Sequence, residues 1–166
     1  MAKRNIIITG GEISSNGIAI YQPQSGVLDI SGGTITGSTA VYAKSGNIDI
    51  SGGKLVATGD KAEYTPNDNG ANSTGNALVI DNCGYPGGTP VVSISGGTFE
   101  SANADAVGSY ATGDLKPVDK FATGGFYTNE VPEEFCVEGY IPVDKNEAGY
   151  YSVKRGEFIA RIGEKG

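Results

Sequence analysis

One phrase of about nine residues recurs along this chain, and it limits the possible folds more than any other feature. The segments "NIIITGGEI", "VLDISGGTI", "NIDISGGKL" and "VVSISGGTF" begin at residues 5, 27, 47 and 91, and a looser copy, "KFATGGFY", begins at residue 120. The first glycines of successive copies are 22, 20, 44 and 28 residues apart. Periods of this kind are typical of repeat proteins, in which each repeat buries its apolar face against its neighbours.

Each copy alternates aliphatic and polar residues, as a half-buried β-strand does. In "NIDIS", Ile48 and Ile50 would face one side, and the equivalent residues of the other copies are Ile6 and Ile8, Leu28 and Ile30, and Val92 and Ile94. Strands stacked about 4.8 Å apart would turn these positions into continuous aliphatic columns. The paired glycines suit a bend that has no room for a Cβ atom or that requires a positive φ.

A second apolar phrase follows each of the first four glycine pairs, at residues 17–21, 39–43, 76–80 and 105–109. Because one such phrase lies within the gap of 44 residues, that gap reads as one repeat enlarged by insertions. The period is too short for a propeller blade, the leucine-rich consensus is missing, and no segment has a sustained helical period. We therefore predict an all-β fold, a right-handed single-stranded parallel β-helix (a solenoid) of about five coils with a C-terminal cap.

Composition and the end of the chain divide this fold into segments. With 27 glycines and 38% hydrophobic residues, the chain is too apolar for disorder and too rich in glycine for a helical protein. We expect β-helix coils over residues 1–117, the last coil and cap over residues 118–154, and a linker or the start of a further unit over residues 155–166. In the cap, "VPEEFC" would form a short helical turn and "AGYYSV" a closing strand, because the open end of a stack must be covered.

Bulk properties exclude several classes of function. The net charge of −7 and the lack of a Lys or Arg cluster argue against a nucleic-acid partner. The chain contains no run of 18 apolar residues, so we predict no membrane span. Because the chain has no histidine, Ser–His and Cys–His nucleophiles and the common transition-metal sites are excluded, so we expect a protein that is not an enzyme. Cys83 and Cys136 form no CxxC pair and are either buried thiols or a disulfide.

The end of the chain resembles a known family. "ISGGTF" followed by "GGFYTNEVPEEFCVEGYIPVDKNEAGYYSVK" resembles a module of large, repetitive surface proteins of anaerobic gut bacteria, in which such a segment closes a run of β-helix coils. The ending "FIARIGEKG" is similar to the opening of their next unit. The resemblance implies an extracellular or cell-surface location, flanking domains of a larger parent protein and an adhesion-like role, and it names no ligand. The start of the chain lacks the apolar region of a secretory signal, which indicates a cytoplasmic or virion-borne protein or a piece of a longer one.

The third coil carries the candidate binding loops. Insertions over Ala57–Thr74 and Asp81–Pro90 leave this coil at successive corners, and loops on a rigid scaffold are frequent recognition sites. A tyrosine ring can stack on a sugar, and amide and carboxylate groups can bond its hydroxyls. We therefore predict a polysaccharide or host-glycan site, against the alternative of a polar loop without a ligand, at Tyr64, Asn67, Asp68, Asn69 and Tyr85.

Asp29 and Asp49 are the candidate metal ligands, because they occupy equivalent outward positions on consecutive coils. Carboxylates stacked about 4.8 Å apart repel, so they would hold Ca²⁺, act as a catalytic pair, or remain a solvated face. The segment "NDNG" is not an EF-hand loop, since Asn76 stands where that motif needs glutamate. We expect no cofactor apart from this candidate Ca²⁺.

Three functions fit these observations. The first is a non-enzymatic extracellular surface module, a structural spacer with an adhesin-like role that binds carbohydrate or host glycans. The second is an enzyme of the polysaccharide lyase or glycosidase type, which rests on analogy of fold and needs convergent charged residues in a groove. The third is a segment of a phage tail fibre.

Overall fold

The computed structural model of this chain describes residues 4–66 and 71–156. Within these ranges the protein is all-β and holds one short 3₁₀ helix and no α-helix, and most strands pair in parallel, so this part of the prediction is confirmed. The elements are β1 (Ile6–Ser14), β2 (Ile18–Gln22), β3 (Val27–Gly37), β4 (Thr39–Ala43), β5 (Asn47–Ile50), β6 (Lys54–Ala57), β7 (Leu78–Asn82), β8 (Val91–Ile94), β9 (Thr98–Ser101), β10 (Val107–Ala111), β11 (Phe126–Tyr127), η1 (Glu133–Phe135), β12 (Tyr140–Val143) and β13 (Tyr151–Arg155).

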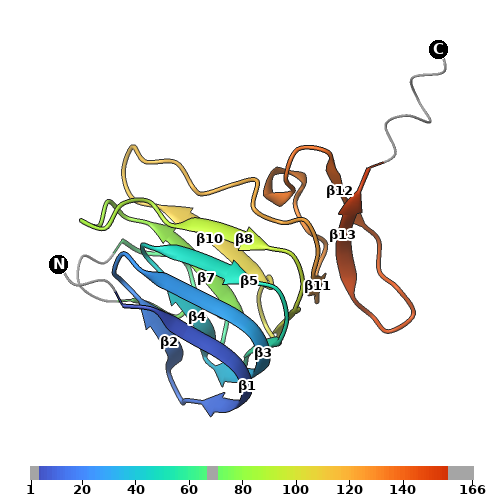
Figure 1. The fold of residues 1–166 in the computed structure, drawn as a ribbon, viewed down its shortest axis with the longest axis horizontal. Helices are drawn as coiled ribbons and strands as arrows, with labels where there is room; N and C mark the ends of the chain where they lie inside the picture. Colours follow the sequence, from blue (N-terminus) through green and yellow to red (C-terminus); the bar gives the residue numbers. More distant parts are fainter. Residues whose placement is uncertain (1–3, 67–70, 157–166) are drawn as a thin grey trace.

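Two sheets contain these strands. The larger sheet has the order β12-β13-β11-β9-β6-β3-β5-β8, with β1 on β3, and the smaller sheet has the order β10-β7-β4-β2. The long strand β3 continues through its glycine pair, so that it pairs with β5 before the bend and with β6 after it. Figure 1 shows the strands of successive repeats lying side by side, from β1 in blue to β8 and β10 in green and yellow.

The predicted aliphatic columns are in register. Ile8 is paired with Ile30, Ile30 with Ile50, and Ile94 with Ile50, and all four side chains are buried. Ile7, on the opposite face of the same strand, is 67% exposed. The alternation within each copy of the repeated phrase therefore identifies correctly which side chains enter the core.

The gap of 44 residues is one enlarged repeat. β5 pairs directly with β8, and β6 pairs directly with β9. In the smaller sheet, β7 lies between β4 and β10. The added residues form the two connections on either side of β7, as the position of the second apolar phrase predicts.

The two members of a glycine pair are required for different reasons. A Cβ atom on Gly52 would lie 2.4 Å from the carbonyl oxygen of Ser31 in the preceding repeat, which is far inside van der Waals contact. Gly53 has a φ of 83°, in the left-handed region that glycine adopts without strain. The expectation of a bend without room for a side chain and with positive φ is therefore confirmed, and each requirement belongs to one glycine of the pair.

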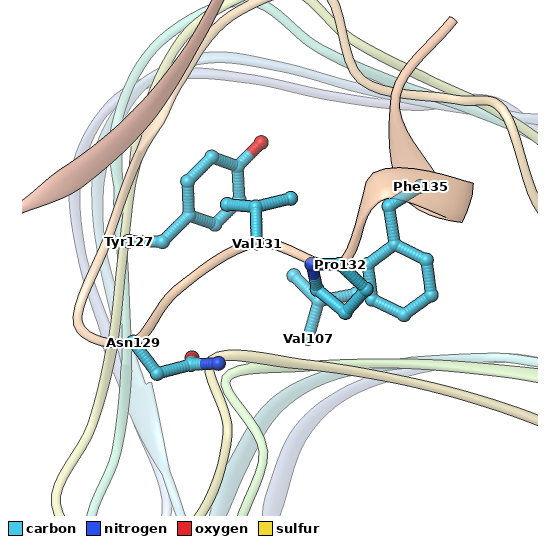
Figure 2. A pocket seen from close by; sticks show the side chains of 6 residues that line it. All are labelled: Val107, Tyr127, Asn129, Val131, Pro132 and Phe135. Atoms are coloured by element: carbon cyan, nitrogen blue, oxygen red, sulfur yellow. The ribbon is translucent and has the colours of Figure 1, made fainter. Parts of the chain in front are cut away.

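The C-terminal segment packs on the last strands of both sheets. The 3₁₀ helix η1 and the strand β13 occur where "VPEEFC" and "AGYYSV" predict them, and β13 is antiparallel to β11 and to β12. Figure 2 shows Val131, Pro132 and Phe135 facing Val107 of β10 and Tyr127 of β11 around a cavity of about 10 Å³. This volume holds about one water molecule, so the segment fills the end of the core closely.

Candidate functional site

The outer face of the smaller sheet is covered by the two insertions of the third repeat. Every residue of β4 and of β7 is buried, on both faces of the sheet. A strand at the surface of a parallel stack would alternate between buried and exposed residues, as β5 does. The chain segments before and after β7 therefore pack onto the sheet, and several polar side chains in or next to β4 and β7 are buried, among them Lys44, Asn76 and Asp81.

Asp81 anchors the first insertion to the sheet. Its side chain is fully buried, and its two carboxylate oxygens accept hydrogen bonds from the hydroxyls of Tyr42 (2.8 Å) and Tyr64 (2.7 Å). Tyr42 belongs to β4, whereas Tyr64 belongs to the insertion, so one carboxylate links the loop to the scaffold. Hydrogen bonds to a charged acceptor are the strong ones, and they hold the Tyr64 ring in one position.

Tyr64 and Tyr110 form a stacked aromatic pair beside this anchor. Their ring centroids are 4.7 Å apart and the planes differ by 6°. The Tyr110 hydroxyl donates to Oδ1 of Asn76 at 2.9 Å, and Asn76 in turn donates from Nδ2 to the carbonyl of Asp105 at 2.7 Å. Both rings are thus fixed at their hydroxyl ends before any ligand arrives.

A groove of about 450 Å³ opens at this aromatic pair. It is lined by Lys61, Ala62, Glu63, Tyr64 and Tyr110. The two tyrosines are half-buried, whereas Lys61 and Glu63 are exposed. The groove therefore joins a rigid aromatic wall to one cationic and one anionic side chain, a combination of apolar surface and a few polar groups that is typical of small-ligand sites.

Tyr85, on the second insertion, packs over a buried lysine. The ammonium group of Lys44 lies 4.9 Å from the centroid of the Tyr85 ring and 6.0 Å from that of Tyr21. Lys44 is fully buried, and the hydroxyls of Tyr21 and Tyr85 are 3.4 Å apart. Cation–π contacts strengthen when the cation is removed from water, so this contact holds the second insertion against the sheet.

The structure places the predicted ligand-binding residues in different surroundings. Tyr64 lines the groove, but its hydroxyl is bound to Asp81, and Tyr85 packs on Lys44 and Tyr21 instead. Asn67, Asp68 and Asn69 lie outside the described residues. The sequence prediction missed Tyr110 and Lys61. Aligning the second apolar phrases would have found Tyr110, because that alignment places it beside Asp81, as the strand register does.

The candidate metal ligands are adjacent. Asp29 of β3 pairs directly with Asp49 of β5, and the neighbours on either side in this column are Ile7 and Ser93. Within residues 4–66 and 71–156, no three acidic or cysteine side chains gather closely enough to share a metal ion. Two carboxylates with an isoleucine and a serine beside them give few ligands for Ca²⁺, which takes six to eight oxygens. The Ca²⁺ site remains a prediction.

The cysteines are separate thiols. Cys136 is buried within the C-terminal segment and Cys83 is half-buried within the second insertion, and neither forms a disulfide. Burial raises the pKa of both thiols, which disfavours the reactive thiolate.

The tyrosines around Asp81 predict a loss of stability at high pH. Burial raises the pKa of Tyr64 from its usual 10.0 to about 12, and burial followed by the bond to Asp81 also raises the pKa of Tyr42. A hydroxyl with a raised pKa holds its proton more tightly in the folded chain than in the unfolded chain, so its contribution is complete below pH 10 and is lost as the pH rises through about 12. The urea concentration at the midpoint of unfolding should therefore be lower at about pH 11.5 than at about pH 9. An unchanged midpoint would contradict the buried tyrosine network.

Comparison of the chain with protein-family models, with curated proteins and with solved structures finds no match. In the described part of the chain, no helix has the length and apolar character needed to cross a membrane.

Proposed function

We propose that this chain is a non-enzymatic extracellular surface module that serves as a rigid spacer and binds a carbohydrate chain. In this proposal the stacked repeats form a right-handed parallel β-helix, which gives the spacer its stiffness. The direct parallel pairing of each repeat with the next, in one register across the core, supports the β-helix. The resemblance of the C-terminal segment to modules of bacterial surface proteins supports the location.

The groove at Tyr64 and Tyr110 is the observation that carries the binding proposal. A flat aromatic ring matches the C–H face of a sugar, and the two rings here are fixed by hydrogen bonds to Asp81 and Asn76. A site that is ordered before binding loses little conformational entropy when the ligand arrives. The exposed Lys61 and Glu63 offer a donor and an acceptor for sugar hydroxyls at the mouth of the groove.

The test is binding of the purified chain to immobilised plant polysaccharides and mucin glycans. We expect the double variant Lys61→Ala/Glu63→Gln to weaken binding at least about tenfold. A tenfold loss of affinity equals about 1.4 kcal/mol, which is the contribution of one or two hydrogen bonds. Both side chains are exposed, so the thermal unfolding temperature should not change.

The matched control is Lys154→Ala/Glu138→Gln, which removes the same charges from exposed positions on the C-terminal segment. This control should bind as the unmodified chain does. If both double variants lose affinity equally, the attraction is a general effect of charge and the groove is not the site. Absence of binding across the whole panel would leave the spacer role and remove the carbohydrate role. Binding that is lost in EDTA, with both double variants unaffected, would point to the Asp29 and Asp49 column instead.

A further inference from the structure

The two ends of the strand stack differ, and among the described residues no strand covers the outer edge of the first repeat. Ile13 of β1 is 36% exposed, whereas Ile35, its partner in register on β3, is fully buried. Ile7, on the outer face of the same strand, is 67% exposed. Among the described strands, β1 pairs only with β3, so its other edge presents free backbone groups, and Figure 1 places it at the lower edge of the stack.

The edge of β1 lacks the features that prevent strands from pairing. Natural edge strands are blocked by lysine, by proline or by short length. Over its nine residues β1 contains three consecutive isoleucines, no proline and a single charged side chain, Glu12. The branches of the larger sheet that run away from β1 end at β12 and at β8. β12 has four residues and contains Pro142, which cannot donate a backbone hydrogen bond, and Ile94 of β8 is bridged to Ala122 of the C-terminal segment. One end of the stack is therefore built to accept a strand and the other is blocked.

We propose that two copies of this chain associate through their open first repeats, related by a two-fold axis between Gly10 and Gly11. An open end cannot pair with the blocked end of another copy. A contact between two open ends therefore gives a closed dimer, in which neither copy offers a further open end. A two-fold axis perpendicular to the sheet makes the two β1 strands antiparallel and leaves their inward side chains on the same face. The core of one copy then continues into the core of the other.

The register of this pairing follows from the position of the axis. It places Ile8 opposite Ile13 of the second copy, so that an inward residue meets an inward residue and both lose their remaining exposure. It places Thr9 opposite Glu12 of the second copy on the outer face. The glycine bend of each strand coincides with that of the other, since the axis passes through both.

The first experiment measures molar mass by light scattering over a range of concentrations. The unmodified chain should reach twice its 17.0 kDa mass, and Ile13→Lys should weaken the association at least about 100-fold, because the dimer would bury two unpaired charges. The control is Val91→Lys, which places the same charge on a 63% exposed aliphatic residue of β8, away from the open end. Circular dichroism and thermal unfolding verify that each variant is folded.

A second experiment tests the register itself, in a Cys83→Ser background that removes the half-buried native thiol. Thr9→Cys combined with Glu12→Cys should form a covalent dimer under mild oxidation, because opposed residues in an antiparallel pair have Cα atoms about 4.5–5.5 Å apart, within disulfide range. Thr9→Cys alone should not, since it lies away from the axis. A monomer at every concentration, a dimer that Ile13→Lys leaves intact, or equal cross-linking by the single and double cysteine variants would each overturn the proposal.

Discussion

The Gly52→Ala chain is expected to be less stable than the unmodified chain by about 3 kcal/mol or more. The added methyl group would lie 2.4 Å from the carbonyl oxygen and 3.1 Å from the carbonyl carbon of Ser31. Both are backbone atoms of the preceding repeat, so the strands themselves would have to separate. Urea unfolding followed by circular dichroism measures the loss.

Gly10→Ala is the matched control, because Gly10 is the same member of the first glycine pair and, among the described strands, none lies on the outer side of β1. No atom lies within 4 Å of the position that its Cβ would take. Measured at a concentration where the chain is monomeric, its effect should stay below about 0.5 kcal/mol. Equal losses for Gly52→Ala and Gly10→Ala would mean that the backbone conformation, and not contact between repeats, sets the requirement for glycine.

Asp81→Ala is expected to detach the first insertion from the sheet and to lower the free energy of unfolding by about 3 kcal/mol. The change leaves the buried hydroxyl of Tyr42 without its acceptor and deprives Tyr64 of the bond that holds it. Lys61 lies in the released segment, so trypsin should cut there at least about tenfold faster, since cleavage follows the population of the opened state.

Two variants separate the anchor from general effects of charge and of the phenol ring. Asp114→Ala removes an exposed carboxylate after β10 and should alter neither stability nor cleavage. Tyr64→Phe removes one hydroxyl and keeps the stacking on Tyr110, so its effect should be smaller than that of Asp81→Ala. If Asp81→Ala leaves cleavage after Lys61 unchanged, the insertion is held by contacts other than this carboxylate.

The fold was largely predictable because the same pattern of inward residues and glycine pairs occurs in several repeats. The alternation around Ile48 and Ile50 occurs in four copies, and each copy supports the same inward assignment. The glycine pairs mark the bends for the same reason. The long spacing between the third and fourth copies could be resolved from the sequence, since the second apolar phrase at residues 76–80 occurs once within it.

The candidate site was less predictable because it depends on contacts between repeats and loops. Loop composition pointed to Tyr64 and Tyr85 as ligand-binding residues, yet each packs on a side chain that is distant in the sequence, Asp81 or Lys44. Polar residues in or next to a strand are usually assigned to solvent, and nothing local marks Asp81 or Lys44 as fully buried. Only the position of the insertions over the smaller sheet determines their burial.

The third repeat also has a consequence for how such a chain can change over evolution. β5 pairs directly with β8 although their paired residues Asn47 and Val91 are more than twice as far apart in the chain as Val27 and Asn47 are. Doubling the length of a flexible connection adds only about 0.6 kcal/mol of closure entropy. The corners next to β7 can therefore accept loops of varied length while the ladder stays in place, as long as the loops still cover the buried Asp81 and Lys44. A new specificity can be introduced there without redesign of the aliphatic core.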